Sequence, residues 1–222
     1  MGFAVTHFDP WTLRYLYREV FARQHYYFSS QSDAPVILDC GANIGMASLY
    51  FKWLYPKSQV QAFEPDPATF KLLQRNFAQN HLDVVTHNCA LWDEDTELDF
   101  YVDSTDPGSL LMSTDASRSK SLPIKVPGRK LSDFIDGPID FLKLDVEGAE
   151  HQVLGDLAKA RKLKSIRQMV VEYHHRIGQQ KSRLGAFLRE LEEAGFEYQI
   201  HASRYPFSSQ NVFQDILIAA CQ

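Results

Sequence analysis

The stretch VILDCGANIG, residues 36–45, joins a short apolar run to an acid, a cysteine and a glycine-rich turn. Residues 36–40 predict a buried strand, and residues 44–54 predict a helix directly after the turn. In α/β folds, a turn between a strand and a helix is a common place for a ligand. Four positions are therefore expected to serve a ligand as well as packing, namely Asp39, Gly41, Asn43 and Gly45.

Downstream of this turn, predicted strands alternate with predicted helices. The strands are expected at 59–63, 84–88, 97–102, 139–144 and 168–173. The helices are expected at 67–80, 147–160 and 181–194. The chain closes with a predicted antiparallel pair, 196–202 and 214–220. This order predicts an α/β protein with a doubly wound, Rossmann-like sheet, in which ligands bind at the carboxyl ends of the strands.

Two segments depart from that alternation. Residues 1–35 are predicted to form a helical cap and a linker, because Asp9 and Pro10 provide a cap and a first turn for an amphipathic helix. Residues 36–222 are then one domain. Within it, about 103–130 is polar and turn-rich without periodicity, so it is predicted to be an irregular insertion.

Composition excludes several classes of protein. A net charge of -5 argues against nucleic acid as the main partner, since phosphate binding needs a basic surface. No apolar run approaches the roughly 18 residues of a membrane span, and the N-terminus lacks the pattern of a signal peptide. The three cysteines are too far apart for a zinc site and odd in number, which indicates reduced thiols. We expect a soluble, cytoplasmic protein.

Two cofactor classes compete for the first turn. A dinucleotide favours G-x-G-x-x-G, whereas Gly41, Asn43 and Gly45 form G-x-N-x-G. The charge of Asp39 would repel a pyrophosphate but suits the ammonium and sulfonium groups of S-adenosylmethionine. Glu64, at the end of the second predicted strand, is expected to accept hydrogen bonds from ribose hydroxyls of either cofactor. The combination favours S-adenosylmethionine and leaves a nicotinamide-dependent oxidoreductase as the alternative.

Five segments resemble one known family. They are LDCGANIGMASLYF (38–51), AFEPDPATFKLLQRN (62–76), NCALWDE (88–94), DFLKLDVEGAEHQVL (140–154) and VVEYH (170–174). In order and spacing the chain is similar to S-adenosylmethionine-dependent methyltransferases of the FkbM family over about 36–175. The resemblance implies a class I methyltransferase sheet of seven strands with the last strand antiparallel, which agrees with the predicted terminal pair.

The resemblance also implies where the cofactor binds. The turn residues Asp39, Gly41, Asn43 and Gly45 would bound its methionine part. Glu64, followed by Pro65, would hold the ribose, and the adenine would lie near Cys89, Ala90 and Leu91. One departure is the segment DEDTE (93–97), which lacks a glycine often found in the family. Segments 1–35 and 103–130 match nothing specific and are expected to select the acceptor.

A second group of polar residues follows the fourth and fifth sheet strands. Methyl transfer requires alignment of nucleophile, methyl carbon and sulfur, and a hydroxyl acceptor must also lose its proton. Asp145, Glu147, Glu172 and His174 are the catalytic candidates, and Asp145 is also expected to contact the cofactor. His174 is the preferred base, because imidazole titrates near neutral pH. Strand alternation points His174 and Glu172 to one side and His175 to the other.

Other interpretations of these residues remain open. His151, one helical turn after Glu147, is placed to assist. Asp145, Glu172 and His174 are alternatively ligands for Mg²⁺ or Mn²⁺, which would lower the pKa of a bound hydroxyl. His174 also fits a structural role as a hydrogen-bonded residue at a strand end, and Glu147 fits a helix N-terminal acid.

These patterns predict O-methylation of a hydroxyl on a small molecule or a glycan sugar. N-methylation, a nicotinamide oxidoreductase and a non-catalytic cofactor-binding scaffold are the alternatives. The sequence does not specify the acceptor, its methylated position or the oligomeric state.

Overall fold

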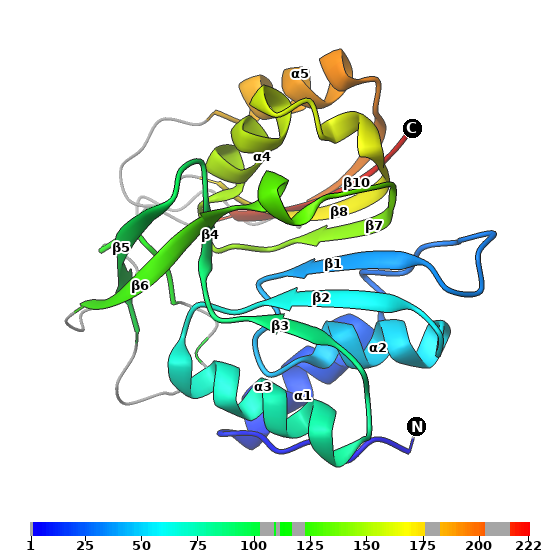
Figure 1. Ribbon diagram of the computed structural model, residues 1–222, viewed down its shortest axis with the longest axis vertical. Coiled ribbons are helices and arrows are strands. Elements are labelled where there is room, and N and C mark those ends of the chain that lie inside the picture. Colours follow the sequence, from blue (N-terminus) through cyan, green and yellow to red (C-terminus); the bar gives the residue numbers. More distant parts are fainter. Residues whose placement is uncertain (1, 103–108, 110–111, 117–122, 176–182, 203–213) are drawn as a thin grey trace.

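The computed structural model describes residues 2–102, 109, 112–116, 123–175, 183–202 and 214–222 (Figure 1). In these residues, a seven-stranded sheet forms the centre of the protein. Its strands in spatial order are β3 (Val85–His87), β2 (Gln59–Phe63), β1 (Val36–Cys40), β7 (Ile139–Leu144), β8 (Ile166–His175), β10 (Gln214–Cys221) and β9 (Glu197–Ala202). The last strand, β10, is antiparallel to both neighbours, whereas the other pairs are parallel. The predicted fold class is confirmed.

Helices cover both faces of this sheet (Figure 1). One face carries α1 (Pro10–Tyr17), the π-helix η1 (Arg18–Ala22), α2 (Met46–Leu54) and α3 (Pro67–Gln79). The other face carries α4 (Glu150–Lys159) and α5 (Leu184–Ala194), with short 3₁₀ turns η2 (Leu131–Phe134) and η3 (Leu163–Ser165) between elements. None of the helices in the described ranges combines the length and apolar character needed to cross a membrane.

The central strand β1 shows why the sheet needs two layers of helices. Ile37 belongs to the hydrophobic cluster that includes α2 and α3, and Leu38 belongs to the cluster that includes α4 and α5. Both side chains are fully buried. A continuous apolar run is what a parallel strand buried on both faces requires.

The N-terminal segment forms the predicted helix, with one difference. The Asp9 carboxylate accepts the backbone N–H of Thr12 at 2.7 Å, and Pro10 occupies the first turn. From Arg18 the helix widens into η1, which the sequence analysis did not anticipate. Phe21 of η1 packs edge-on against Tyr50 of α2, so the segment lies against the main domain.

Part of the predicted irregular insertion is a strand. β6 (Pro123–Lys130) lies between β4 (Ala90–Trp92) and β5 (Thr96–Tyr101) in a small second sheet. The prediction of an irregular segment to residue 130 was therefore wrong at its C-terminal end. Two prolines interrupt the strand pattern in the sequence. Both lie in the part of β6 that pairs with β5 alone, before the part that also pairs with β4. Residues 103–108, 110–111 and 117–122 lie outside the described part.

The turn after β1 depends on two glycines for different reasons. Gly41 has a φ of +81°, and a Cβ atom there would lie 1.7 Å from the backbone oxygen of Asp145. Gly45 has a φ of +92°, and its Cβ would lie 2.8 Å from the Phe77 ring. Between them Asn43 also adopts a positive φ, of 49°. The spacing of the motif thus follows from backbone geometry and from close contact with the loop after β7.

Two glycine substitutions are expected to act in opposite directions. Gly41→Ala should reduce the free energy of unfolding by at least about 2 kcal/mol, because it combines backbone strain with overpacking. Gly155→Ala should instead stabilise by about 0.5–1 kcal/mol, since Gly155 lies inside α4 with open space around it. Denaturant unfolding of both variants tests this, and equal stability of Gly41→Ala and the parent protein would contradict the steric argument.

Candidate functional site

A cavity of about 730 Å³ opens at the carboxyl ends of the main-sheet strands. Its wall takes residues from the turn after β1, the ends of β2 and β8, the loop after β7, strand β4 and the N-terminal segment. Eleven of the residues expected from sequence line it: Gly41, Asn43, Glu64, Pro65, Cys89, Ala90, Leu91, Asp145, Glu147, Glu172 and His174. The topology therefore brings together both predicted groups of residues.

Glu64 lies at the end of β2, where its carboxylate is buried. Its oxygens accept the backbone N–H groups of Asn43 and Asp66, both at 2.9 Å. Burial raises the pKa of Glu64 to about 8, although the two backbone hydrogen bonds act in the opposite direction. At neutral pH this carboxyl group therefore holds a proton for much of the time, until a donor from a ligand favours the charged form.

Asp39 takes a different position from the one expected. Its side chain is fully buried, with Oδ2 accepting the Ser48 hydroxyl at 2.6 Å and Oδ1 lying 3.4 Å from Nζ of Lys143. It lies behind the cavity wall, and the expectation of direct contact with a cofactor is not supported by this geometry. Gly45 likewise lies against Phe77 and is not part of the wall.

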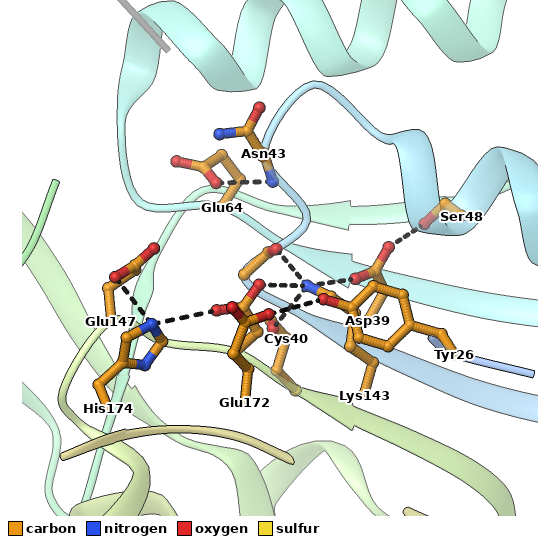
Figure 2. A network of polar contacts seen from close by, with 12 residues as sticks. Tyr26, Asp39, Cys40, Asn43, Ser48, Glu64, Lys143, Glu147, Glu172 and His174 are labelled. Atoms are coloured by element: carbon orange, nitrogen blue, oxygen red, sulfur yellow. Dashed lines mark hydrogen bonds and ion pairs between the residues drawn. The ribbon is translucent and has the colours of Figure 1, made fainter. Parts of the chain in front are cut away.

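Lys143 is a buried residue of the cavity wall that the sequence analysis missed. It lies in β7 with its side chain 4% exposed, and Figure 2 shows its ammonium group between several oxygens. Nζ donates to the backbone oxygen of Gly41 at 2.6 Å and lies 3.2 Å from Oδ2 of Asp145. Burial alone would lower the pKa of Lys143, but Asp145 and Asp39 outweigh it and the pKa is raised. A lysine inside the apolar run FLKL was the available signal.

Tyr26 brings the N-terminal segment into the same network. Its hydroxyl donates to Glu172 at 3.1 Å, and its ring lies 5.2 Å from Nζ of Lys143 (Figure 2). The pKa of the Tyr26 phenol is raised, first by burial and then by the charge of Glu172, so the group is a donor at all ordinary pH values. Nothing in the local sequence around Tyr26 indicates this contact, which spans 146 positions of the chain.

The DVEGAE loop after β7 has an unusual backbone. Glu147 has a φ of +54° and Gly148 a φ of +108°. Two hydrogen bonds hold this conformation: Glu150 accepts the Gly148 N–H at 2.9 Å, and the Ser113 hydroxyl donates to the Glu147 backbone oxygen at 2.6 Å. A strained non-glycine residue at a cavity is a frequent feature of functional loops. In this loop the backbone conformation of Glu147 directs its carboxylate toward His174.

His174 is held between two carboxylates. Nδ1 lies 2.8 Å from Glu150 and Nε2 lies 3.0 Å from Glu147. Ionised carboxylates only accept, so both ring nitrogens must donate and the ring is an imidazolium. Burial acts to lower the pKa of His174, but Glu147 and Glu150 outweigh it and hold the pKa well above its usual value. As the base expected from sequence, His174 would first have to lose the proton on Nε2.

The carboxylates around His174 also define a candidate cation site. Within the described residues, the ligand atoms of Asp145, Glu147 and His174 lie within 4.8 Å of one another. Glu172, which the sequence analysis placed in the metal set, is instead engaged by Tyr26. The cluster thus contains Glu147 where the sequence analysis expected Glu172. A cation would fit the three groups only after replacing the proton on Nε2 of His174.

Two other histidines were considered from sequence. Nε2 of His151 lies 2.9 Å from the Tyr173 hydroxyl, and its ring packs edge-on against Phe187. It therefore belongs to the packing between α4 and α5, and the expectation that it assists at the site is wrong. The side chain of His175 lies outside the described part of the structure.

Comparison with known proteins shows which family the chain resembles. The Methyltransferase FkbM domain matches residues 39–198. "Methyltransferase 1" of Beauveria bassiana (strain ARSEF 2860) is 34% identical over 167 residues, which cover 65% of this chain and 67% of that protein. "31-O-demethyl-FK506 methyltransferase FkbM" of Streptomyces tacrolimicus is 31% identical over 211 residues, covering 78% and 79%.

A solved structure supports the fold. The crystal structure of Methyltransferase FkbM from Methylobacillus flagellatus KT superposes with a TM-score of 0.57 at 19% identity. The match covers 91% of this chain but 47% of that chain, so the protein described here spans about half of its length. The family match extends over most of the chain and includes the turn after β1, Glu64 and the DVEGAE loop. The chain belongs to the FkbM methyltransferase family, and the protein is a methyltransferase.

Proposed function

We propose that the protein uses S-adenosylmethionine to methylate a hydroxyl oxygen of a small molecule or sugar. The same cavity is lined by Glu64, at the end of β2, and by the charged group around Lys143, at the ends of β1 and β7. This shared cavity is the observation that carries the proposal. One end suits a ribose, and the other has an excess of negative charge. Both are needed for a cofactor that carries a ribose and a sulfonium.

The order of the strands predicts the orientation of the bound cofactor along the edge of the sheet. Cys89, Ala90 and Leu91, which follow β3, would contact adenine, and Glu64 at β2 would accept the ribose hydroxyls. The turn after β1 and the loop after β7 line the next part of the cavity and would border the sulfonium. There the carboxylates of Asp39, Asp145, Glu147 and Glu172 outnumber the two cations, Lys143 and the His174 imidazolium. This imbalance favours a sulfonium and disfavours the pyrophosphate of a nicotinamide cofactor.

Oxygen is proposed as the acceptor atom because a proton acceptor lies in the cavity wall. Glu147 lines the cavity with its side chain 23% exposed, and the His174 imidazolium orients its carboxylate. When bound, S-adenosylmethionine would supply the methyl group to the acceptor oxygen and keep the electron pair of the broken carbon–sulfur bond on sulfur. Glu147 would accept the hydroxyl proton. The Streptomyces tacrolimicus relative is named for methylation of an oxygen, which supports O-methylation over N-methylation.

Glu64 should make cofactor binding depend on pH. In the free protein its pKa is about 8. Donation by ribose hydroxyls stabilises the carboxylate and lowers that pKa, so binding expels a proton. Affinity for S-adenosylhomocysteine should rise from pH 6 to pH 8 and level off above. Calorimetric titration in two buffers of different ionisation enthalpy measures the released proton directly.

Glu64→Gln is the matched variant for this experiment. It retains the shape of the side chain but has no proton to lose, so affinity should fall and its pH dependence should disappear. NAD serves as the control ligand. Binding of NAD in place of S-adenosylhomocysteine would refute the cofactor assignment and favour the oxidoreductase alternative.

Glu147 should affect the chemical step rather than cofactor binding. In Glu147→Gln, methyl transfer should fall about 10²–10⁴-fold, because the acceptor proton has no base. Affinity for S-adenosylhomocysteine should change less than about twofold. The assay is an acceptor screen that detects the mass gain of one methyl group, with the exposed Glu94→Gln as control. If Glu147→Gln retained full turnover, the base would lie elsewhere; absence of any acceptor would favour a non-catalytic scaffold.

A divalent cation is the second candidate for activating the hydroxyl, held by Asp145, Glu147 and His174. The observed geometry favours a proton at Nε2 of His174, since both nitrogens face carboxylates. We therefore expect methyl transfer to be unchanged by EDTA. Loss of turnover in EDTA, with recovery on addition of Mn²⁺ or Mg²⁺, would establish the cation instead.

A further inference from the structure

A charged cluster in the N-terminal segment forms a part of the cavity wall that the mechanism above does not use. The segment contributes Arg18, Glu19 and Arg23, and all three line the cavity. The Glu19 carboxylate accepts from Nη1 of Arg23 with both oxygens at 2.9 Å, and from Nε of Arg18 at 3.2 Å. Glu19 therefore holds two guanidinium groups at one place on the wall.

The π-helix explains why Glu19 faces inward. In η1 the backbone N–H of Arg23 bonds to the carbonyl of Arg18, five residues earlier. The wider turn places Glu19 and Val20 in buried positions, although α1 immediately before it has no buried residue. Single π-helical turns inside helices are frequent at functional sites. Here the turn gives the cluster a fixed orientation.

The charges of the cluster fit an anion. Two arginines and one glutamate leave one positive charge, while the arginine side chains remain 57% and 54% exposed. The bonds to Glu19 occupy Nε of Arg18 and Nη1 of Arg23, and guanidinium has five N–H donors. Arginine is well suited to bind a carboxylate. Around Lys143, by contrast, the same cavity has an excess of negative charge.

The proposed orientation of the cofactor indicates which of its groups is the anion that the arginines would bind. With adenine beside β4 and ribose at β2, the amino-acid group must extend past β1, away from the adenine end. The N-terminal segment forms the wall there, because Tyr26 lies over Lys143 and Lys143 contacts Gly41. In this orientation the acidic group around Asp145 would be the partner of the ammonium, and the arginines would be the partners of the carboxylate.

We propose that Arg18 and Arg23, oriented by Glu19, bind the carboxylate of the amino-acid group of S-adenosylmethionine. This rests on the proposed cofactor and assigns a role to residues 1–35. The segment that covers the site would then recognise the cofactor as well as the acceptor.

Two ligands allow this proposal to be tested separately from the cofactor assignment. S-adenosylhomocysteine and 5′-methylthioadenosine share the adenine, the ribose and a thioether, but only the first carries the amino-acid group. In the double variant Arg18→Ala, Arg23→Ala, affinity for S-adenosylhomocysteine should fall on the order of tenfold or more. Affinity for 5′-methylthioadenosine should stay within about twofold. Calorimetric titration with both ligands gives the ratio of the two affinities in the parent protein and in the double variant.

Arg14→Ala is the matched control, since Arg14 lies one turn before Arg18, is exposed and does not line the cavity. It should leave both affinities unchanged. An equal loss for both ligands in the double variant, or no loss for either, would overturn the proposal while leaving the cofactor assignment in place. If the parent protein bound neither ligand, the cofactor assignment and this proposal would fail together.

Discussion

The buried ammonium group of Lys143 connects the parts of the protein on which the site depends. It donates to the backbone oxygen of Gly41 and pairs with Asp39 and Asp145, so it joins the ends of β1 and β7. Removal of one partner from a buried ionic group leaves an uncompensated charge, which is strongly destabilising. The acids paired with Lys143 are therefore needed for the stability of the fold.

The two loops at this junction support each other through backbone shape. Gly41 and Glu147 both have positive φ, and the Asp145 carbonyl occupies the space where a side chain at Gly41 would lie. One oxygen of the Glu150 carboxylate, Oε1, contacts both the Gly148 N–H of the second loop and Nδ1 of the His174 ring. Both loops therefore carry backbone strain beside the cavity, and neighbouring hydrogen bonds compensate for it.

Much of the site could be predicted because it lies at strand ends. The residues that follow parallel strands share one edge of the sheet, so Glu64, Cys89 and Asp145 were expected in one place before their distances were known. The orientation of individual side chains was harder to predict from the sequence. Asp39 turns behind the wall because a buried lysine attracts it, and His151 turns toward Tyr173 because α4 packs against α5. Each outcome depends on a residue from another element.

Strand and helix periodicity by itself determined the α/β class, the antiparallel pair of strands at the C-terminus and the edge of the sheet that carries the site. These properties follow from local patterns that repeat along the chain. Only the tertiary structure decided the protonation of His174, the partner of Glu172 and the presence of Arg18 and Arg23 in the cavity wall. The physical reason is that electrostatic energy and hydrogen bonding depend on distances between groups far apart in the chain, and on burial, which folding alone creates.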